Sequence, residues 1–114
     1  MLPVEGSIGL LRRVSLFVTL IACTAGIAFS ADAAAGKATY SKKCQACHGA
    51  AGEGNQNLAK VLKVAIRPLG SSAVQAKSDD DLRKDIVNGT GKMKPVKLTD
   101  AEASDVVAWI RTLK

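Results

Sequence analysis

The chain has 114 residues, of which 47% are apolar and only 4% aromatic, with 16 basic against 10 acidic side chains. This length supports one domain. The net charge of +6 suits nucleic-acid binding, but the sequence has neither interleaved aromatic and basic residues nor a nucleic-acid motif. We therefore expect no nucleic-acid ligand and expect the charge to steer the chain toward acidic protein surfaces.

The first third of the chain has the composition of a secretory signal peptide. A polar start ends in Arg12-Arg13, residues 14–29 form an uncharged apolar run, and small residues follow. Basic, apolar and small-residue regions in this order are typical of an exported leader. We expect a signal peptide over residues 1–33, a mature domain over residues 34–114 and a periplasmic location. Cleavage after Ser30 would also fit the small-residue pattern.

Two alternatives to simple removal of this leader stay open. The apolar run is shorter than the roughly 20 residues that span a bilayer comfortably, yet an uncleaved leader would still be an anchor. Leu20-Ile21-Ala22-Cys23 resembles a bacterial lipobox, in which Cys23 would be acylated. The apolar run continues to Phe29, however, whereas a lipoprotein leader turns polar after its cysteine. We expect membrane association only in one of these two cases.

Residues 36–43 have helical character and lead into Cys44-Gln45-Ala46-Cys47-His48. Two cysteines three positions apart, with histidine directly after the second, are typical of c-type haem attachment. One helical turn would bring both sulfurs to one edge of a porphyrin, where they form thioethers, with the histidine below the iron. The pattern predicts one covalent haem c held by Cys44 and Cys47, with His48 as an iron ligand.

Three other functions of this pentapeptide are disfavoured. A structural zinc site needs four ligands, and Cys44, Cys47 and His48 supply three with no second cluster. A thioredoxin-like dithiol needs a βαβ context, and no strand is evident. A disulfide between the two cysteines would leave the histidine without a role. A covalent macrocycle would also supply a core to residues 34–114, which contain one Trp, one Tyr and no Phe.

The segments around the motif predict further helices. Gly36 and Tyr40 lie four residues apart, so they share a helix face that suits a close crossing, although an exposed Tyr40 is the alternative. Residues 49–55 are glycine-rich and predict a turn. Residues 57–65 predict a weak helix, and residues 71–77 a loop or one loose turn after the break at residues 67–70. The weak helix has its apolar side chains on one face: Leu58, Val61, Leu62 and Ala65.

Two later helices have clearer starts. Ser78 precedes three aspartates, an arrangement that caps a helix rather than binds a metal, because consecutive residues point around a helix. Leu82 and Ile86 form its apolar seam, and Asn88-Gly89 ends it. Thr99-Asp100-Ala101-Glu102 is a capping box for the last helix. Its apolar stripe has Trp109 at the border and consists of Ala103, Val106, Val107, Ile110 and Leu113.

Met93 is the only methionine in residues 34–114, and it lies in a glycine-punctuated loop between helices, flanked by Lys92 and Lys94. A methionine that fills a core usually lies on a helix or strand among apolar side chains. A thioether held in this loop by Gly91 and Pro95 fits the second axial ligand of the iron. His/Met ligation would raise the reduction potential.

Residues 34–114 resemble the small monohaem class I cytochromes c of bacterial periplasms. The resemblance implies an all-α fold of three to four helices wrapped around one covalent haem, with the N- and C-terminal helices crossing near Trp109 and Ile110. It also implies that the Pro68 carbonyl accepts the Nδ1–H of His48, which would orient the ring. The resemblance rests on Gly36 and Tyr40, the haem motif with Gly49, Asn88-Gly89-Thr90-Gly91-Lys92-Met93-Lys94-Pro95, Leu98-Thr99-Asp100 and Trp109-Ile110-Arg111.

One residue departs from the family pattern: Lys94 stands between Met93 and Pro95, where many members have proline directly after methionine. With both axial positions filled, the chain is expected to be a one-electron carrier that serves redox partner proteins, and not an enzyme. A cytochrome subunit of a larger periplasmic oxidoreductase and a haem-based ligand sensor are the alternatives. Lysines near the two ligand segments could surround an exposed haem edge or simply keep the surface soluble: Lys42, Lys43, Lys92, Lys94 and Lys97.

Overall fold

The computed structural model describes residues 30–114, so the expected leader lies almost wholly outside the described residues, as does Cys23. Within residues 30–114 there is no strand, and an isolated bridge pairs Thr90 with Met93. The all-α prediction is confirmed. No helix in this part of the chain is long and apolar enough to cross a membrane. The helices are α2 (Ala33–Lys43), α3 (Gln45–His48), α4 (Gln56–Leu62), α5 (Ser72–Gln75), α6 (Asp79–Asn88), α7 (Asp100–Ile110) and the 3-10 turn η1 (Arg111–Leu113).

Four of these helices have seven or more residues, in line with the three to four expected, whereas α3 and α5 are single turns of four residues. The predicted caps are present. The Ser78 hydroxyl accepts from the Asp81 amide at the start of α6 (3.1 Å). At the start of α7, Thr99 and Glu102 each accept from the other's amide, so the capping box is confirmed.

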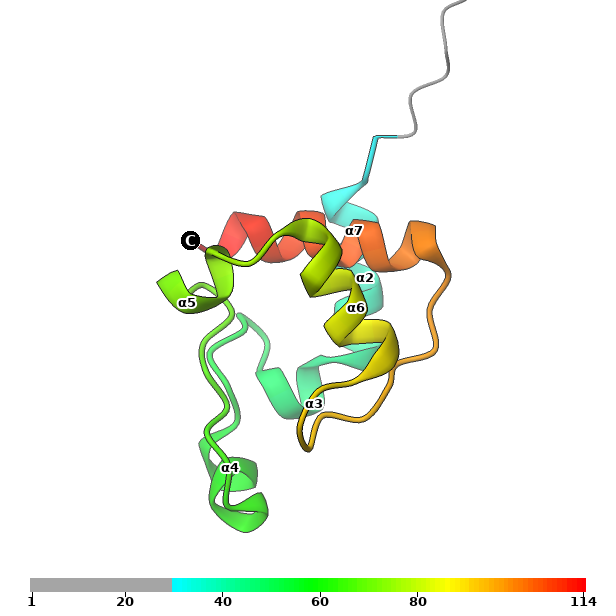
Figure 1. The fold of residues 1–114 in the computed structure, drawn as a ribbon. Coiled ribbons are helices and arrows are strands. Elements are labelled where there is room, and N and C mark those ends of the chain that lie inside the picture. Colours follow the sequence, from blue (N-terminus) through cyan, green and yellow to red (C-terminus); the bar gives the residue numbers. More distant parts are fainter. Residues whose placement is uncertain (1–29) are drawn as a thin grey trace, which may run out of the picture.

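The two terminal helices, α2 and α7, cross closely (Figure 1). Gly36 is buried at the crossing, where a Cβ would lie 1.8 Å from the Asp105 carbonyl oxygen. One turn later, the Tyr40 ring lies 4.1 Å from the Trp109 ring, centroid to centroid. Tyr40 is 1% exposed, so the alternative of an exposed tyrosine is wrong. The predicted crossing is confirmed, and Trp109, expected at the border of the stripe, lies inside the core.

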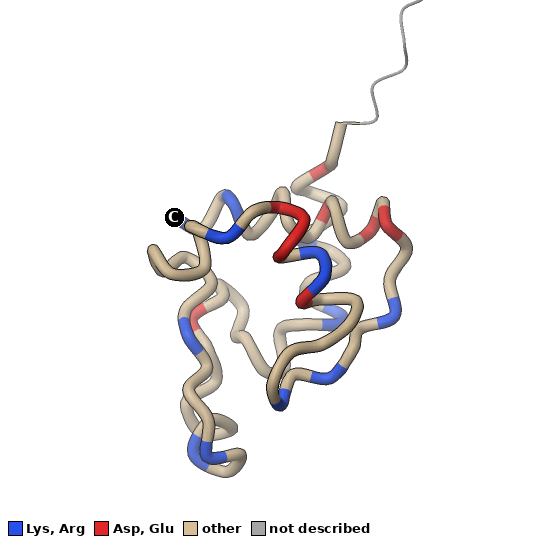
Figure 2. Tube along the Cα trace, in the orientation of Figure 1, with Lys and Arg blue, Asp and Glu red and all other residues tan. Residues whose placement is uncertain are grey.

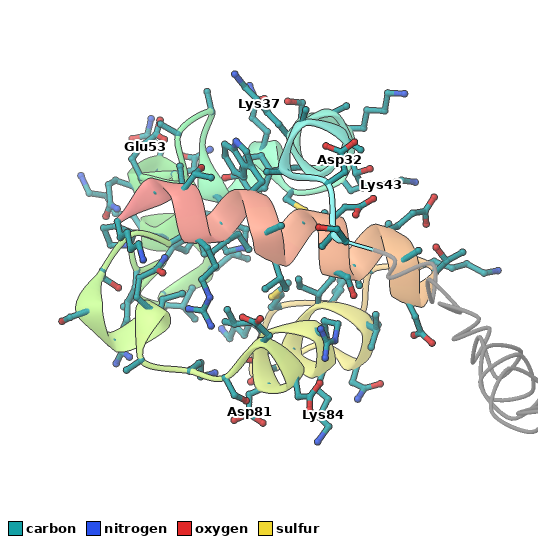
Figure 3. The ribbon with its side chains drawn as sticks, turned by 90° about the horizontal axis from the view of Figure 1, so that it is seen from above. Asp32, Lys37, Lys43, Glu53, Asp81 and Lys84 are labelled. Atoms are coloured by element: carbon teal, nitrogen blue, oxygen red, sulfur yellow. The ribbon has the colours of Figure 1, made fainter. Side chains whose placement is uncertain are left out.

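Helix α6 completes the core against α7. Leu82 and Ile86 are each 6% exposed, which confirms the predicted seam. The outer face of this helix is polar, and in Figure 3 Asp81 and Lys84 point away from α7. The core therefore lies between α2, α6 and α7 and consists of Tyr40, Cys44, Leu82, Ile86, Val106, Val107, Trp109 and Ile110.

Helix α4 differs from its prediction. It lies apart from α7, at the end of two extended segments that lead from α3 and back toward α5 (Figure 1). It ends at Leu62 because Lys63 takes a left-handed conformation with φ 54°. Ala65 is therefore beyond the helix, and Val61 is 76% exposed. The weak helix predicted for residues 57–65 therefore forms as far as Leu62, and of its four apolar residues only Leu58 and Leu62 are half-buried.

Residues 71–77 contain the single turn α5, which hydrogen bonds hold against the end of α7. The Gln75 side-chain amide donates to the carbonyls of Leu69 and Ile110, both at 3.0 Å. Arg111 donates to the Gln75 carbonyl (2.9 Å) and pairs with Asp79 at the start of α6 (2.8 Å). These bonds place the segment around Pro68 relative to the helical core.

Candidate functional site

The predicted haem-attachment pentapeptide forms one helical turn directly after α2. Cys44 joins α2 to α3, and its carbonyl accepts from the amides of Cys47 (3.3 Å) and His48 (3.0 Å). Residues three apart on a helix lie on the same side, so the two thiols are presented together. Cys44 is buried, Cys47 is exposed, and neither forms a disulfide. Cys44 therefore lies inside the apolar core, and Cys47 lies at the surface one turn later.

The chain that leaves His48 folds back and secures this turn. Gly49 has φ 82°, a conformation that favours glycine, and the Tyr40 hydroxyl donates to its carbonyl (2.6 Å). The Asn55 amide then donates to the Cys47 carbonyl (2.9 Å), and its side chain donates to the Ala46 carbonyl (3.2 Å). Carbonyls at the end of α3 therefore have partners from outside that turn.

The His48 imidazole is suited to bind a metal. Burial lowers the pKa of His48, which favours the neutral ring with its nitrogen lone pair. Its Nδ1 atom is buried and has no hydrogen-bond partner among the described residues. The bond expected to the Pro68 carbonyl is not formed in this structure, and that carbonyl accepts from the Ser71 amide (3.0 Å). A role for Pro68 stays a prediction.

Met93 lies on the loop between α6 and α7, as predicted. The Met93 amide donates to the Thr90 carbonyl (2.9 Å), and the Thr90 amide donates to the Met93 carbonyl (3.1 Å). The Val96 amide donates to the Ile86 carbonyl (2.9 Å). A Cβ on Gly89 would lie 2.5 Å from the Met93 carbonyl oxygen, so the loop folds closely on itself. The Met93 side chain is half-buried and packs on the core cluster that contains Cys44.

The residues fit a covalently bound haem. Two thiols are presented one turn apart, a neutral imidazole follows them, and a thioether contacts the same apolar cluster as one of the thiols. His48 Nδ1 is buried without a partner among the described residues, and a haem on the other ring nitrogen would leave that atom to a second-shell acceptor. In the described part of the chain, no three His, Cys, Asp or Glu side chains converge on a metal position.

Charge is unevenly distributed around this site. Figure 2 shows acidic residues concentrated at the starts of α6 and α7, whereas basic residues lie in and directly after α4 and along the loop before α7. The five lysines expected near the ligand segments are all exposed: Lys42, Lys43, Lys92, Lys94 and Lys97. Lys92 differs from its neighbours because its ammonium donates to the Leu62 carbonyl (2.7 Å).

Two contacts at the site were not predicted from the sequence. For the Tyr40–Gly49 bond the sequence offered a partial indication, because a buried tyrosine hydroxyl needs a hydrogen-bond partner. Which residue supplies that partner depends on the fold. The Lys92–Leu62 bond had none, because its partner is a backbone carbonyl 30 residues away.

The family model for cytochrome c matches residues 33–114. A search of curated proteins found no match. The family match covers the crossing helices, the cysteine–histidine turn and the Met93 loop. Its members hold a c-type haem covalently and generally transfer electrons. The turn at residues 44–48 and the helices packed around it all lie within the matched range. The chain belongs to the cytochrome c family.

Proposed function

We propose that this chain is a one-electron carrier in which Cys44 and Cys47 hold the haem and His48 and Met93 are the two axial ligands of its iron. The haem supplies a one-electron redox couple when bound. The chain supplies two thiols for attachment and an imidazole from residues 44–48, and a thioether from the loop between α6 and α7. With both axial positions filled by protein groups, no position is left for a substrate, oxygen or peroxide, and we infer that the chain is not an enzyme by itself.

The position of Met93 carries this proposal. It is the only thioether in residues 34–114, it is half-buried rather than free in solvent, and it packs on the cluster that includes Cys44. A thioether ligand favours ferrous iron and therefore raises the reduction potential. The apolar core residues on which Met93 packs act in the same direction, because an apolar environment disfavours the more highly charged ferric state.

Replacement of Met93 by alanine tests the ligand assignment. We expect Met93→Ala to give high-spin or misligated iron and to lower the midpoint potential by a fraction of the roughly 0.8 V range that axial ligands set. The measurements are a visible spectrum and a redox titration of the holoprotein. Val96→Ala is the matched control, since it removes apolar volume from the same half-buried loop. An unchanged spectrum and potential in Met93→Ala would exclude Met93 as a ligand.

We further propose that the protein is exported to the periplasm and exchanges electrons with partners that have acidic docking surfaces. The support is the leader composition and the exposed lysines beside both ligand segments. Cell fractionation tests the location. Gel filtration at physiological salt separates a free carrier, which elutes as a small protein, from a subunit of a larger oxidoreductase, which co-elutes with its partner. Ready binding of carbon monoxide by the native ferrous protein would favour a ligand sensor instead.

A further inference from the structure

Lys92, the residue before the proposed ligand Met93, bonds across the site. Its Nζ donates to the carbonyl oxygen of Leu62 at 2.7 Å. Leu62 is the last residue of α4, and the final carbonyls of a helix have no partner within the helix. A lysine ammonium at this end also interacts favourably with the negative end of the helix dipole. The bond therefore gives the Leu62 carbonyl a partner that the helix lacks and places the Lys92 ammonium where the helix dipole favours positive charge.

This bond joins two segments that are otherwise separate. Among the hydrogen bonds of the described residues, no other bond links α4 (Gln56–Leu62) to a part of the chain outside residues 55–64. The loop on the other side has little else to hold its tip. Gly91 is exposed, has φ 56°, and a Cβ there would meet nothing within 4 Å. Lys92 thus restrains both the tip of the Met93 loop and α4.

We propose that Lys92 is a positioning residue for Met93: its bond to the Leu62 carbonyl holds the loop of residues 89–95 against α4 and keeps the thioether on the iron. This role rests on the proposed ligation. Loss of the bond frees the loop tip, and an open loop releases the thioether. Lys94, on the other side of Met93, is exposed and has no hydrogen-bond partner among the described residues, so it contributes charge only.

Three variants of the holoprotein separate the bond from the charge. Lys92→Leu removes the donor without adding a second thioether beside Met93, Lys94→Leu removes the same charge without breaking a bond, and Lys92→Arg keeps a cationic donor. The readout is the rate and affinity with which imidazole displaces the thioether from ferric iron, since displacement requires the loop to open. Hydrogen exchange of the Thr90 and Met93 amides, which bond to each other's carbonyls, is a second readout.

We expect Lys92→Leu to bind imidazole about three- to tenfold more tightly, the size of effect that one exposed charge-assisted bond supports. Lys94→Leu should change the imidazole affinity less than about twofold, and Lys92→Arg should restore the wild-type affinity. If Lys92→Leu and Lys94→Leu have equal effects while the wild type is low-spin, the role of Lys92 is overturned and the ligation stands. A high-spin wild-type spectrum would overturn the Met93 assignment and this role together.

A separate observation concerns the start of the folded domain. The Asp32 carboxylate accepts from the amides of Ala34 (2.9 Å) and Ala35 (3.2 Å), so it caps α2. Its own amide donates to the Asp105 carboxylate on α7 (2.7 Å). Figure 3 shows Asp32 at the end of α2 that lies beside α7. Asp32 therefore belongs to the folded domain by two independent sets of bonds.

The two leader cleavage positions that fit the sequence differ in what they leave behind. Cleavage after Ala33 would remove this cap and place the ammonium of Ala34 in the first turn of α2, where the helix dipole disfavours positive charge. Cleavage after Ser30 keeps Asp32 and puts the ammonium on Ala31. Ala31 lines a hollow together with Asp100, Asp105 and Arg83, and the Arg83 guanidinium already pairs with Asp80. The two carboxylates outnumber this paired cation and favour an ammonium there.

We infer that the leader is removed by hydrolysis of the Ser30–Ala31 bond, which rests on the proposed export. Intact mass and N-terminal sequencing of the exported protein test it, with Ala31 as the expected first residue. A start at Ala34 would overturn it while leaving export intact. A retained leader or a lipid on Cys23 would overturn it together with simple cleavage. Between chains that start at Ala31 and Ala34, we expect the first to have an unfolding equilibrium constant lower by about 2- to 30-fold.

Discussion

The two halves of this molecule are built differently. On the side of α2, α6 and α7, side chains fill the core, and Tyr40, Val106 and Val107 are at most 2% exposed. On the side of residues 49–70, Ala59 is the only buried apolar side chain in that described segment, and Val61 is 76% exposed. The helical half, formed by α2, α6 and α7, has a core of buried side chains. In the loop half, residues 49–70, most of the larger apolar side chains are only half-buried.

This difference indicates where the haem contributes to the fold. The cysteine–histidine turn and Met93 lie at the boundary between the two halves, because Cys44 and Met93 both contact the helical core. A haem bound there would give the half-buried side chains of the loop half a surface to pack on. The free energy that orders residues 49–70 then comes largely from the cofactor, as it does in other small domains that fold around a bound group.

Loss of attachment should have the largest effect. In Cys44→Ala/Cys47→Ala, which cannot form thioethers, we expect the chain to lose cooperative unfolding, with residues 49–70 unprotected from hydrogen exchange. Far-UV circular dichroism with denaturant and hydrogen exchange would measure this. If the variant unfolds cooperatively without haem and residues 49–70 stay protected, the loop half would have a core of its own and the comparison above would be wrong.

The helix crossing should respond to a single methyl group. Helix propensity alone predicts that Gly36→Ala stabilises α2 by about 1 kcal/mol. The Cβ would lie 1.8 Å from the Asp105 carbonyl oxygen, however, so the helices must separate. We expect a net loss of about 1–3 kcal/mol in the free energy of unfolding. Ala38→Gly on the exposed side of α2 is the control for propensity. A stabilised Gly36→Ala would show that the crossing is not tight.

The Tyr40 hydroxyl links the helical half to the chain directly after the cysteine–histidine turn, and its removal should have the smallest effect. Tyr40→Phe loses the bond to the Gly49 carbonyl but keeps the ring against Trp109, so we expect a loss of about 1 kcal/mol. Denaturant unfolding at pH 7 measures this difference. A variant as stable as the wild type would show that this bond adds nothing to stability.

The stability difference between the wild type and Tyr40→Phe should depend on pH. Burial raises the pKa of Tyr40 to about 12, from an ordinary value of 10. The folded state therefore favours the neutral phenol. Its contribution is complete below pH 10 and is lost as the pH rises through about 12. The stability advantage of the wild type over Tyr40→Phe should shrink in that window, as measured by unfolding at several pH values.

Local sequence signals predicted much of the structure. Ser78 and the Thr99–Glu102 box start helices where expected, because a capping side chain acts within its own turn. Leu82 and Ile86 face the core, because helical spacing decides which side chains share a face. Gly36 and Tyr40 marked the crossing for the same reason. In residues 57–65 the predicted helix forms only as far as Leu62, because Lys63 ends it, and helical spacing did not reveal that Val61 is exposed.

The sequence by itself determined the chemistry of this protein: two thiols and an imidazole within one turn, a single thioether in a loop, and helices with readable starts. Spacing along one segment is enough for these, because they depend on residues within one or two turns of each other. Only the tertiary structure decided which groups meet across the chain. It brought Tyr40 to Gly49, Lys92 to Leu62 and Asp32 to Asp105, and it left His48 Nδ1 without a partner among the described residues. Such contacts depend on how whole helices and loops pack, and no local pattern encodes them.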